Sequence, residues 1–121
     1  MDKVKWRERI KQASIDAGTY RPYFDSIIDT LAEIMETRDD ARRIYYESGG
    51  ETVVEYTNKG GATNYVKNPA LVIVDDMNKT ALAYWKELGL TPAGLKRINE
   101  TALKGAKDKP SLGAVLKDLG I

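Results

Sequence analysis

The sequence predicts a mainly α-helical protein built on a long antiparallel hairpin of two helices, with shorter helices at both ends. We expect a small β-hairpin or ordered loop between the two long helices. Glycine and proline residues divide the 121-residue chain into segments of helical length. Apolar residues within these segments recur every three or four positions, which is the period of one buried helix face. A chain of this length supports one modest core.

The domain organisation follows from the same boundaries. We expect a single helical domain over residues 1–104, with a basic amino-terminal helix over 1–21, the hairpin over 22–89 and a short helix over 90–104. Residues 105–121 are expected to form a basic linker and an amphipathic tail. The apolar residues of that tail are Leu112, Val115, Leu116 and Leu119. Such a tail is marginal alone and usually docks on a larger surface.

Two helices are predicted before the middle of the chain. The first covers residues 3–17 and ends at Gly18, which suits the left-handed position after a helix. The second begins at Pro22, runs to about Ser48 and stops at Gly49. Its predicted buried face consists of Ile27, Ile28, Leu31, Ile34, Met35, Ala41, Ile44 and Tyr45.

The connection between the long helices is predicted to be a β-hairpin or an ordered loop. Residues 52–57 are rich in β-branched and aromatic side chains, residues 58–61 form a turn signal, and residues 62–66 return as a second strand. The second long helix then begins with Asn68 as its N-cap and ends at Leu88.

The first turns of that second helix are apolar on nearly every side. A two-helix hairpin cannot cover all sides of such a stretch, so another surface must do so. A second subunit or the first helix of the same chain are the two alternatives. On the first alternative, the oligomer interface includes Leu71, Val72, Ile73, Val74 and Met77.

The last predicted helix begins at Thr91 and Pro92 and ends near Lys104. Residues 86–103 therefore have the order helix, turn, helix, which also suits a DNA-reading helix-turn-helix motif. A glycine-containing turn between two helices is common in all helical proteins, so this signal is weak alone.

The residue types exclude several kinds of chemistry. The chain has no cysteine and no histidine, which removes thiol nucleophiles, thiolate zinc sites and the commonest general base. The acidic series at residues 25, 29, 33, 36 and 40 suits a solvated helix face, which can lie opposite a basic arm of a neighbour, better than a metal site. We expect no catalytic residue, no metal and no cofactor.

Charge is distributed unevenly along the chain. Residues 1–21 carry a net charge of +3, residues 22–50 carry −4, residues 51–89 carry −1 and residues 90–121 carry +3. The basic ends can bind phosphates, or they can attract the acidic middle of a neighbouring subunit. The DNA-binding candidates are Lys3, Lys5, Arg7, Arg9, Lys11, Arg21, Lys96, Arg97, Lys104, Lys107 and Lys109.

The start of the chain is charged and lacks the apolar stretch of a signal peptide. The longest apolar run, residues 70–74, is far shorter than the roughly 20 residues that span a bilayer. We therefore expect a cytosolic protein with no membrane contact.

Four segments occur in a distinctive order and spacing. They are Ala17–Pro22, Asn58–Asn64, Lys67–Leu71 and Leu88–Pro92. Together they resemble the small terminase subunit of tailed bacteriophages over about residues 15–100. The resemblance implies a ring-forming homo-oligomer that binds double-stranded phage DNA in the host cytoplasm. It also implies recognition of the packaging start and regulation of a separate large subunit, which holds the ATPase and the nuclease.

Two other interpretations remain open at the level of the sequence. The chain can be a protein-binding scaffold or adaptor whose basic ends pair with its acidic helix. It can also be a small transcriptional regulator that uses residues 86–103 to read a palindromic site as a dimer.

Overall fold

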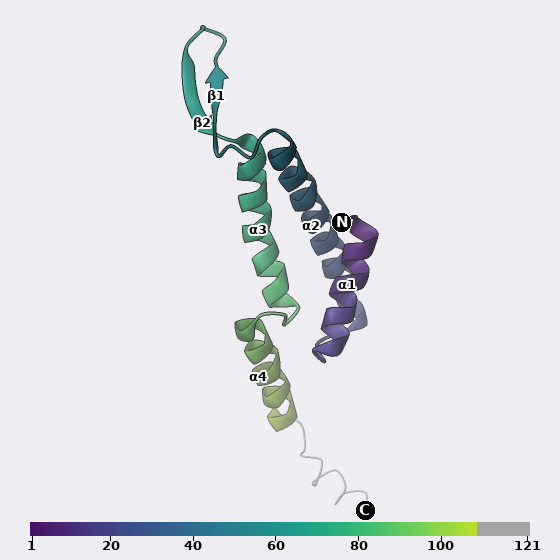
Figure 1. Ribbon diagram of the computed structural model, residues 1–121. Coiled ribbons are helices and arrows are strands. Elements are labelled where there is room, and N and C mark those ends of the chain that lie inside the picture. Colours follow the sequence, from purple (N-terminus) through teal and green to yellow (C-terminus); the bar gives the residue numbers. More distant parts are fainter. Residues whose placement is uncertain (109–121) are drawn as a thin grey trace, which may run out of the picture.

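The computed structural model describes the backbone of residues 1–108 and the side chains of residues 1–101. The elements in chain order are α1 (Lys3–Asp16), the short 3₁₀ helix η1 (Pro22–Phe24), α2 (Asp25–Glu47), β1 (Val53–Thr57), β2 (Thr63–Lys67), α3 (Pro69–Glu87) and α4 (Pro92–Asp108). Figure 1 shows the long hairpin of α2 and α3 with the two strands at its tip. The predicted fold class is confirmed.

The ends of α1 and α2 lie close to the predicted positions because local side chains determine them. The Asp2 carboxylate caps α1 by accepting a hydrogen bond from the Lys5 amide at 2.9 Å. Gly18 follows α1 with a φ of +73°, a conformation that glycine adopts without strain. At the second helix, Pro22 begins the single turn η1, and the regular α2 starts three residues later at Asp25.

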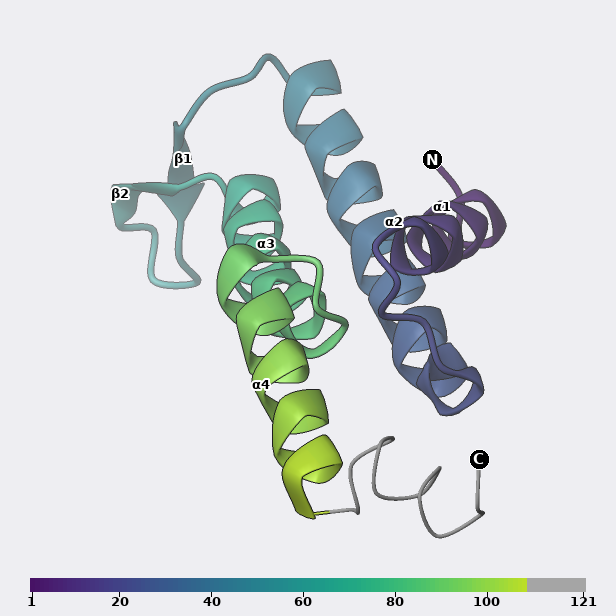
Figure 2. The same ribbon diagram turned by 90° about the horizontal axis from the view of Figure 1, so that it is seen from below.

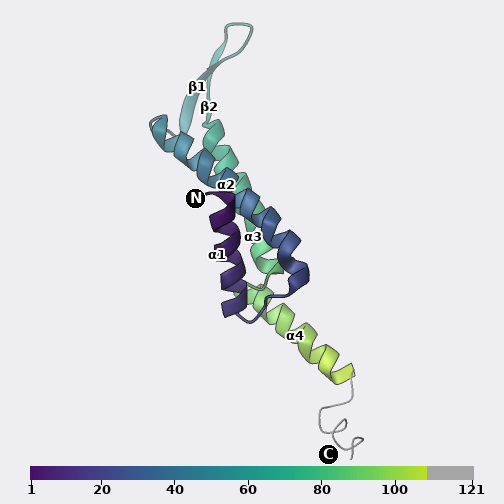
Figure 3. The same cartoon turned by 90° about the vertical axis from the view of Figure 1, so that its right-hand side faces the viewer.

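The two strands form an antiparallel hairpin that extends from the tip of the helical hairpin (Figures 1 and 3). Its register pairs Val54 with Val66 and Thr57 with Thr63. Buried Asn68 fixes the base of this hairpin, since its amide group donates to the Glu51 carbonyl at 3.0 Å and its carbonyl oxygen caps α3. The predicted β-hairpin and the predicted N-cap are both confirmed.

Helix α1 packs along α2 beside residues 29–39, and α4 extends beyond the far end of α3 (Figures 1 and 2). The predicted end of the last helix at Lys104 was wrong, because α4 continues to Asp108. Residues 105–108 are therefore helical and do not belong to a linker. Gly105 weakens a helix by only about 1 kcal/mol, whereas Pro110 is the strong helix breaker in this region. The tail over residues 109–121 lies outside the described residues.

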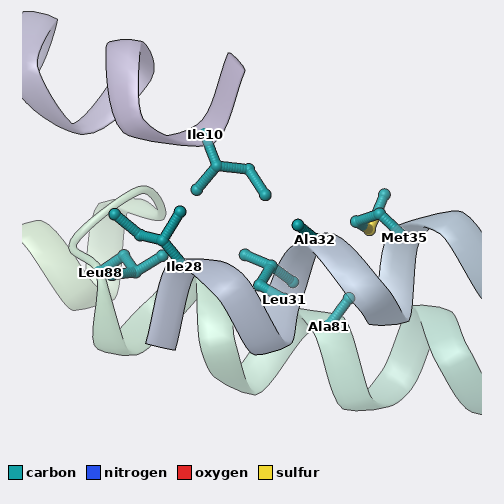
Figure 4. Packing of buried hydrophobic residues seen from close by; sticks show 7 residues of the cluster. All are labelled: Ile10, Ile28, Leu31, Ala32, Met35, Ala81 and Leu88. Atoms are coloured by element: carbon teal, nitrogen blue, oxygen red, sulfur yellow. The ribbon is translucent and has the colours of Figure 1, made fainter. Parts of the chain in front are cut away.

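The core lies where α1, α2 and α3 meet (Figure 4). Ile10 of α1 inserts against Ile28, Leu31 and Met35 of α2, and Ala81 of α3 closes the cluster from the other side. Within the predicted buried face of α2, Ile44 is an exception with 50% of its surface exposed. Ile44 lies beyond the part of α2 that α1 covers, and among the described helices only α3 reaches that end of α2.

Candidate functional site

A set of charged contacts holds α1 against α2. We call it the α1–α2 clasp, and it consists of Lys3, Trp6 and Arg7 on α1 with Asp29, Glu33, Glu36 and Asp39 on α2. The Lys3 ammonium lies 2.8 Å from Glu33 and 3.2 Å from Asp29, and its backbone amide donates to Glu36 at 2.6 Å. Arg7 approaches Asp29 at 3.5 Å. Hydrogen bonds from Lys3 to Glu33 and Asp29 raise the pKa of the lysine.

Asp39 is the most connected carboxylate of the clasp. It accepts hydrogen bonds from the Trp6 indole at 2.7 Å and from Arg38 at 2.8 Å. Partial burial alone raises its pKa, but the hydrogen bonds from Arg38, Trp6 and the terminal amine outweigh burial and leave the pKa below its usual value. The Arg38 guanidinium also lies 5.6 Å from the centre of the Trp6 ring, within cation–π range. The clasp therefore combines charge, hydrogen bonding and aromatic packing.

Three of the five residues in the acidic series face the basic helix of their own chain, whereas Asp40 pairs with Arg43 within α2. Asp29, Glu33 and Glu36 contact α1, and Asp25 accepts a hydrogen bond from the Tyr20 hydroxyl at 2.8 Å. The sequence indicated a solvated helix face, with a neighbour's basic arm as one partner, whereas these three carboxylates pair with α1 of the same chain. Over the described residues, no group of three carboxylates converges as a metal site would require.

The predicted DNA-binding residues fall into three groups. Lys5, Arg9, Lys11 and Arg21 are exposed, and no carboxylate lies within 4.0 Å of their charged groups in the described part of the chain. Lys3, Arg7, Lys96 and Arg97 are engaged with carboxylates. The side chains of Lys104 and Lys107 on α4 are not described, and Lys109 lies outside the described residues.

A cleft lies where the connection between α1 and α2 meets the turn between α3 and α4. It has a volume of about 440 Å³, and we call it the polar cleft. Its lining residues are Thr19, Arg21, Tyr23, Phe24, Glu87, Arg97, Ile98 and Thr101. The Arg97 guanidinium binds the Glu87 carboxylate through two hydrogen bonds of 3.0 and 3.3 Å. This hydrogen bonding lowers the pKa of Glu87 and raises that of Arg97.

Gly89 joins the two sides of this region at close range. It has a φ of +71°, and a Cβ atom at this position would lie 2.6 Å from Ile98 Cδ1 and 2.9 Å from Thr19 Cγ2. A side chain at this position would have the strained left-handed backbone and would force Ile98 and Thr19 to move, so glycine suits this turn. Sequence reasoning identified Gly89 as a helix stop, but it did not reveal the cleft, because the two arginines are far apart along the chain.

A second hollow, the apolar groove, lies between α2 and α3 near the β-hairpin. Its volume is about 370 Å³. The residues that line it are Thr37, Asp40, Ala41, Ile44, Ala70 and Ile73. Of the predicted interface residues, Val74 is buried, Leu71 and Met77 are half-buried, and Val72 and Ile73 are 37% and 42% exposed. Helix α1 contacts α2 elsewhere and leaves the start of α3 uncovered.

The opposite side of α3 carries another exposed apolar residue, Leu82, with 61% of its surface exposed. Nine residues separate Leu82 from Ile73, which is two and a half helical turns, so the two side chains point in opposite directions. The hairpin therefore has apolar surface on both flanks. The two flanks differ in their residues.

The predicted helix-turn-helix segment and one acidic residue of α3 complete the comparison. Asp75 pairs with Lys67 of β2, although Lys79 lies one turn further along the same helix. Residues 86–103 do contain a helix, a turn and a helix, with the Thr91 hydroxyl accepting a hydrogen bond from the Gly94 amide at 3.0 Å. However, the first of these helices is the long hairpin helix α3, and α4 extends away from the hairpin (Figure 3).

These features define a helical protein whose candidate functional surfaces are a set of exposed cations, a polar cleft and an apolar groove. A family model described as phage terminase, small subunit, matches residues 3–104. The chain therefore belongs to the phage terminase small subunit family. No curated protein and no solved structure matches it. None of the described helices is long and apolar enough to cross a membrane.

Proposed function

We propose that this protein is a non-catalytic DNA-packaging subunit of a tailed phage, which binds double-stranded DNA in the host cytoplasm as a homo-oligomeric ring. In this role it recognises the packaging start and regulates the large subunit that holds the ATPase and the nuclease. The family match carries the proposal, and the exposed cations that have no carboxylate partner among the described residues support it.

The proposed DNA contacts are electrostatic and individually weak. Lys5 and Arg9 lie four residues apart, so they share one face of α1, and neither is paired with a carboxylate in the described structure. Lys3 and Arg7 point to α2 instead and serve the clasp. A few phosphate contacts per subunit give useful affinity when a ring repeats them, because the second and later contacts form within one complex.

The two flanks of the hairpin support ring assembly. Burying the groove at Ile44 and Ile73 against a different surface, such as the flank at Leu82, produces a head-to-tail contact. Contacts of this kind close into rings when the rotation between subunits permits it. A two-fold dimer would instead place the same surface on both sides of the interface.

DNA binding is tested by band shifts over a series of KCl concentrations. Binding should weaken steeply with salt, and the double variant Lys5→Glu/Arg9→Glu should bind at least about tenfold more weakly, since each lost contact is worth on the order of 1 kcal/mol. Lys59→Glu/Lys79→Glu is the matched control, because it reverses two exposed cations that lie in the β-hairpin turn and on α3 rather than on α1. Equal loss in both variants would show that only the total charge matters.

Assembly is tested by light scattering on the same protein. Ile44→Glu/Ile73→Glu should yield monomers that keep the helical circular dichroism signal, while the control Val4→Glu, at an apolar position exposed on α1, should leave the mass unchanged. An unchanged mass for the groove variant would place the interface elsewhere.

The clasp supports one alternative, a protein-binding adaptor, because it shows that the basic helix pairs with the acidic one. An adaptor gives no band shift even at low salt. A ring of more than four subunits would exclude a dimeric helix-turn-helix regulator.

A further inference from the structure

We propose that the polar cleft is a binding site for a DNA backbone phosphate, and that Glu87 occupies the Arg97 side of this site when no DNA is bound. This inference rests on the proposed function, because it assigns a location to one DNA contact and a means of regulating it.

The cleft brings together the two basic ends of the sequence. Arg21 belongs to the amino-terminal segment and Arg97 to the carboxy-terminal segment, each of net charge +3, and both line the same cavity. Glu87 is the only acidic residue among the described lining residues. Arg21 is exposed, and its guanidinium donates one hydrogen bond to the Tyr20 carbonyl at 2.7 Å, which leaves other donors free to bind a ligand.

The Arg97–Glu87 pair already has the geometry that recognises a phosphate. A guanidinium presents two parallel N–H groups, and it binds two oxygens of a carboxylate or of a phosphate in the same way. Glu87 therefore occupies the donors that a phosphate would use. The pair is about half exposed on each side, and exposed ion pairs of this kind add little to stability because water screens the two charges. A phosphate held by both Arg97 and Arg21 can displace the carboxylate.

The remaining lining residues suit a nucleic acid at the mouth of the cleft. The Tyr23 ring is 73% exposed, and it contacts Phe24 edge to face with ring centres 4.8 Å apart. An aromatic edge beside an arginine accommodates the sugar and phosphate of a DNA strand. Gly89 lies close to both Thr19 and Ile98, so the two arginine-bearing segments meet at this turn.

The test measures affinity of the full-length protein for a labelled duplex over a KCl series. Arg21→Ala and Arg97→Ala should each weaken binding about five- to tenfold and reduce the slope of log K against log salt by about 1. Since phosphate contacts carry no sequence information, the loss should be equal for packaging-start DNA and unrelated DNA. Lys59→Ala, which removes an exposed cation in the β-hairpin turn, is the control and should have no effect.

Glu87→Gln tests whether the Glu87 carboxylate competes with DNA for Arg97. It should strengthen DNA binding about two- to fivefold in the otherwise unchanged protein, because it frees Arg97 and removes a negative charge. In the Arg97→Ala background the same change should have a smaller effect, because its action through Arg97 is lost. If Glu87→Gln weakens binding as much as Arg97→Ala does, the pair is only a structural link and the proposal is wrong.

Two further arms separate the possible outcomes. Arg97→Lys retains the positive charge but loses the two parallel N–H groups of the guanidinium, so this variant should bind DNA with intermediate affinity. It replaces Arg97→Ala in the test if Arg97→Ala does not fold. Inorganic phosphate should compete with DNA more strongly than chloride at equal ionic strength, and this advantage should disappear in the arginine variants. If the arginine variants bind DNA as well as Lys59→Ala does, the cleft is not a phosphate site, but the proposed function still stands. If the wild-type protein binds no DNA, the proposed function is refuted as well.

Discussion

Replacing Gly89 with alanine should destabilise the protein far more than the same change at Gly18. Both glycines follow a helix and have nearly equal φ values, +71° and +73°. An alanine in this left-handed conformation costs roughly 1–2 kcal/mol at either position. At Gly18 nothing lies within 4 Å of the added Cβ, so this backbone cost is the whole effect.

At Gly89 the added methyl group also meets two side chains. The Cβ would lie 2.6 Å from Ile98 Cδ1 and 2.9 Å from Thr19 Cγ2, and Thr19 is buried. Overpacking of this kind costs typically about 1–3 kcal/mol, which gives a total of roughly 2–5 kcal/mol for Gly89→Ala. Urea unfolding followed by circular dichroism, at one fixed protein concentration, measures both variants. Equal losses for Gly18→Ala and Gly89→Ala would refute the close approach of Thr19 and Ile98 to this turn.

Three further changes test other parts of the structure. Ile10→Ala should lower the free energy of unfolding by about 2–5 kcal/mol in the same assay, since Ile10 has no exposed surface. Asp39 has a lowered pKa in the folded protein, so its contribution to stability is present above the unfolded value of about 3.9 and is lost as the pH falls through the lower folded value. In thermal unfolding measured over a pH series, Asp39→Asn should therefore lose less stability than the wild type as the pH falls. If both proteins lose the same stability at acidic pH, Asp39 is not the source of the loss. Thr91→Ala should cost about 0.5–2 kcal/mol as the loss of an N-cap, whereas Thr101→Ala, whose hydroxyl bonds to the Arg97 carbonyl within α4, should be nearly neutral.

The helices and the β-hairpin could be predicted because their boundaries depend on nearby residues. Gly18, Asn68 and Gly89 act within one helical turn of their own position, so their effect is visible in the sequence. The end of α4 was harder to locate, since Gly105 is a weak helix breaker and did not terminate the helix.

The partners of charged residues could not be predicted in the same way. Asp75 has Lys79 one helical turn away, yet it pairs with Lys67 on the adjacent strand, because the hairpin brings that strand to the start of α3. Likewise, the helical period places Ile44 on an apolar face but does not show how far α1 extends along α2. The polar cleft depends on residues at opposite ends of the chain, so only the folded structure reveals it.

The clasp has a consequence for the order of folding. Ion pairs and side-chain hydrogen bonds join Met1 and the residues of α1 to α2. The paired residues are only 22 to 38 positions apart in the sequence. A helix of 14 residues is marginal alone, so α1 gains stability only once α2 is present. During synthesis both helices leave the ribosome before α3, and their short loop closure makes their pairing fast. We therefore expect the paired α1 and α2 to be the surface on which the later-emerging α3 condenses.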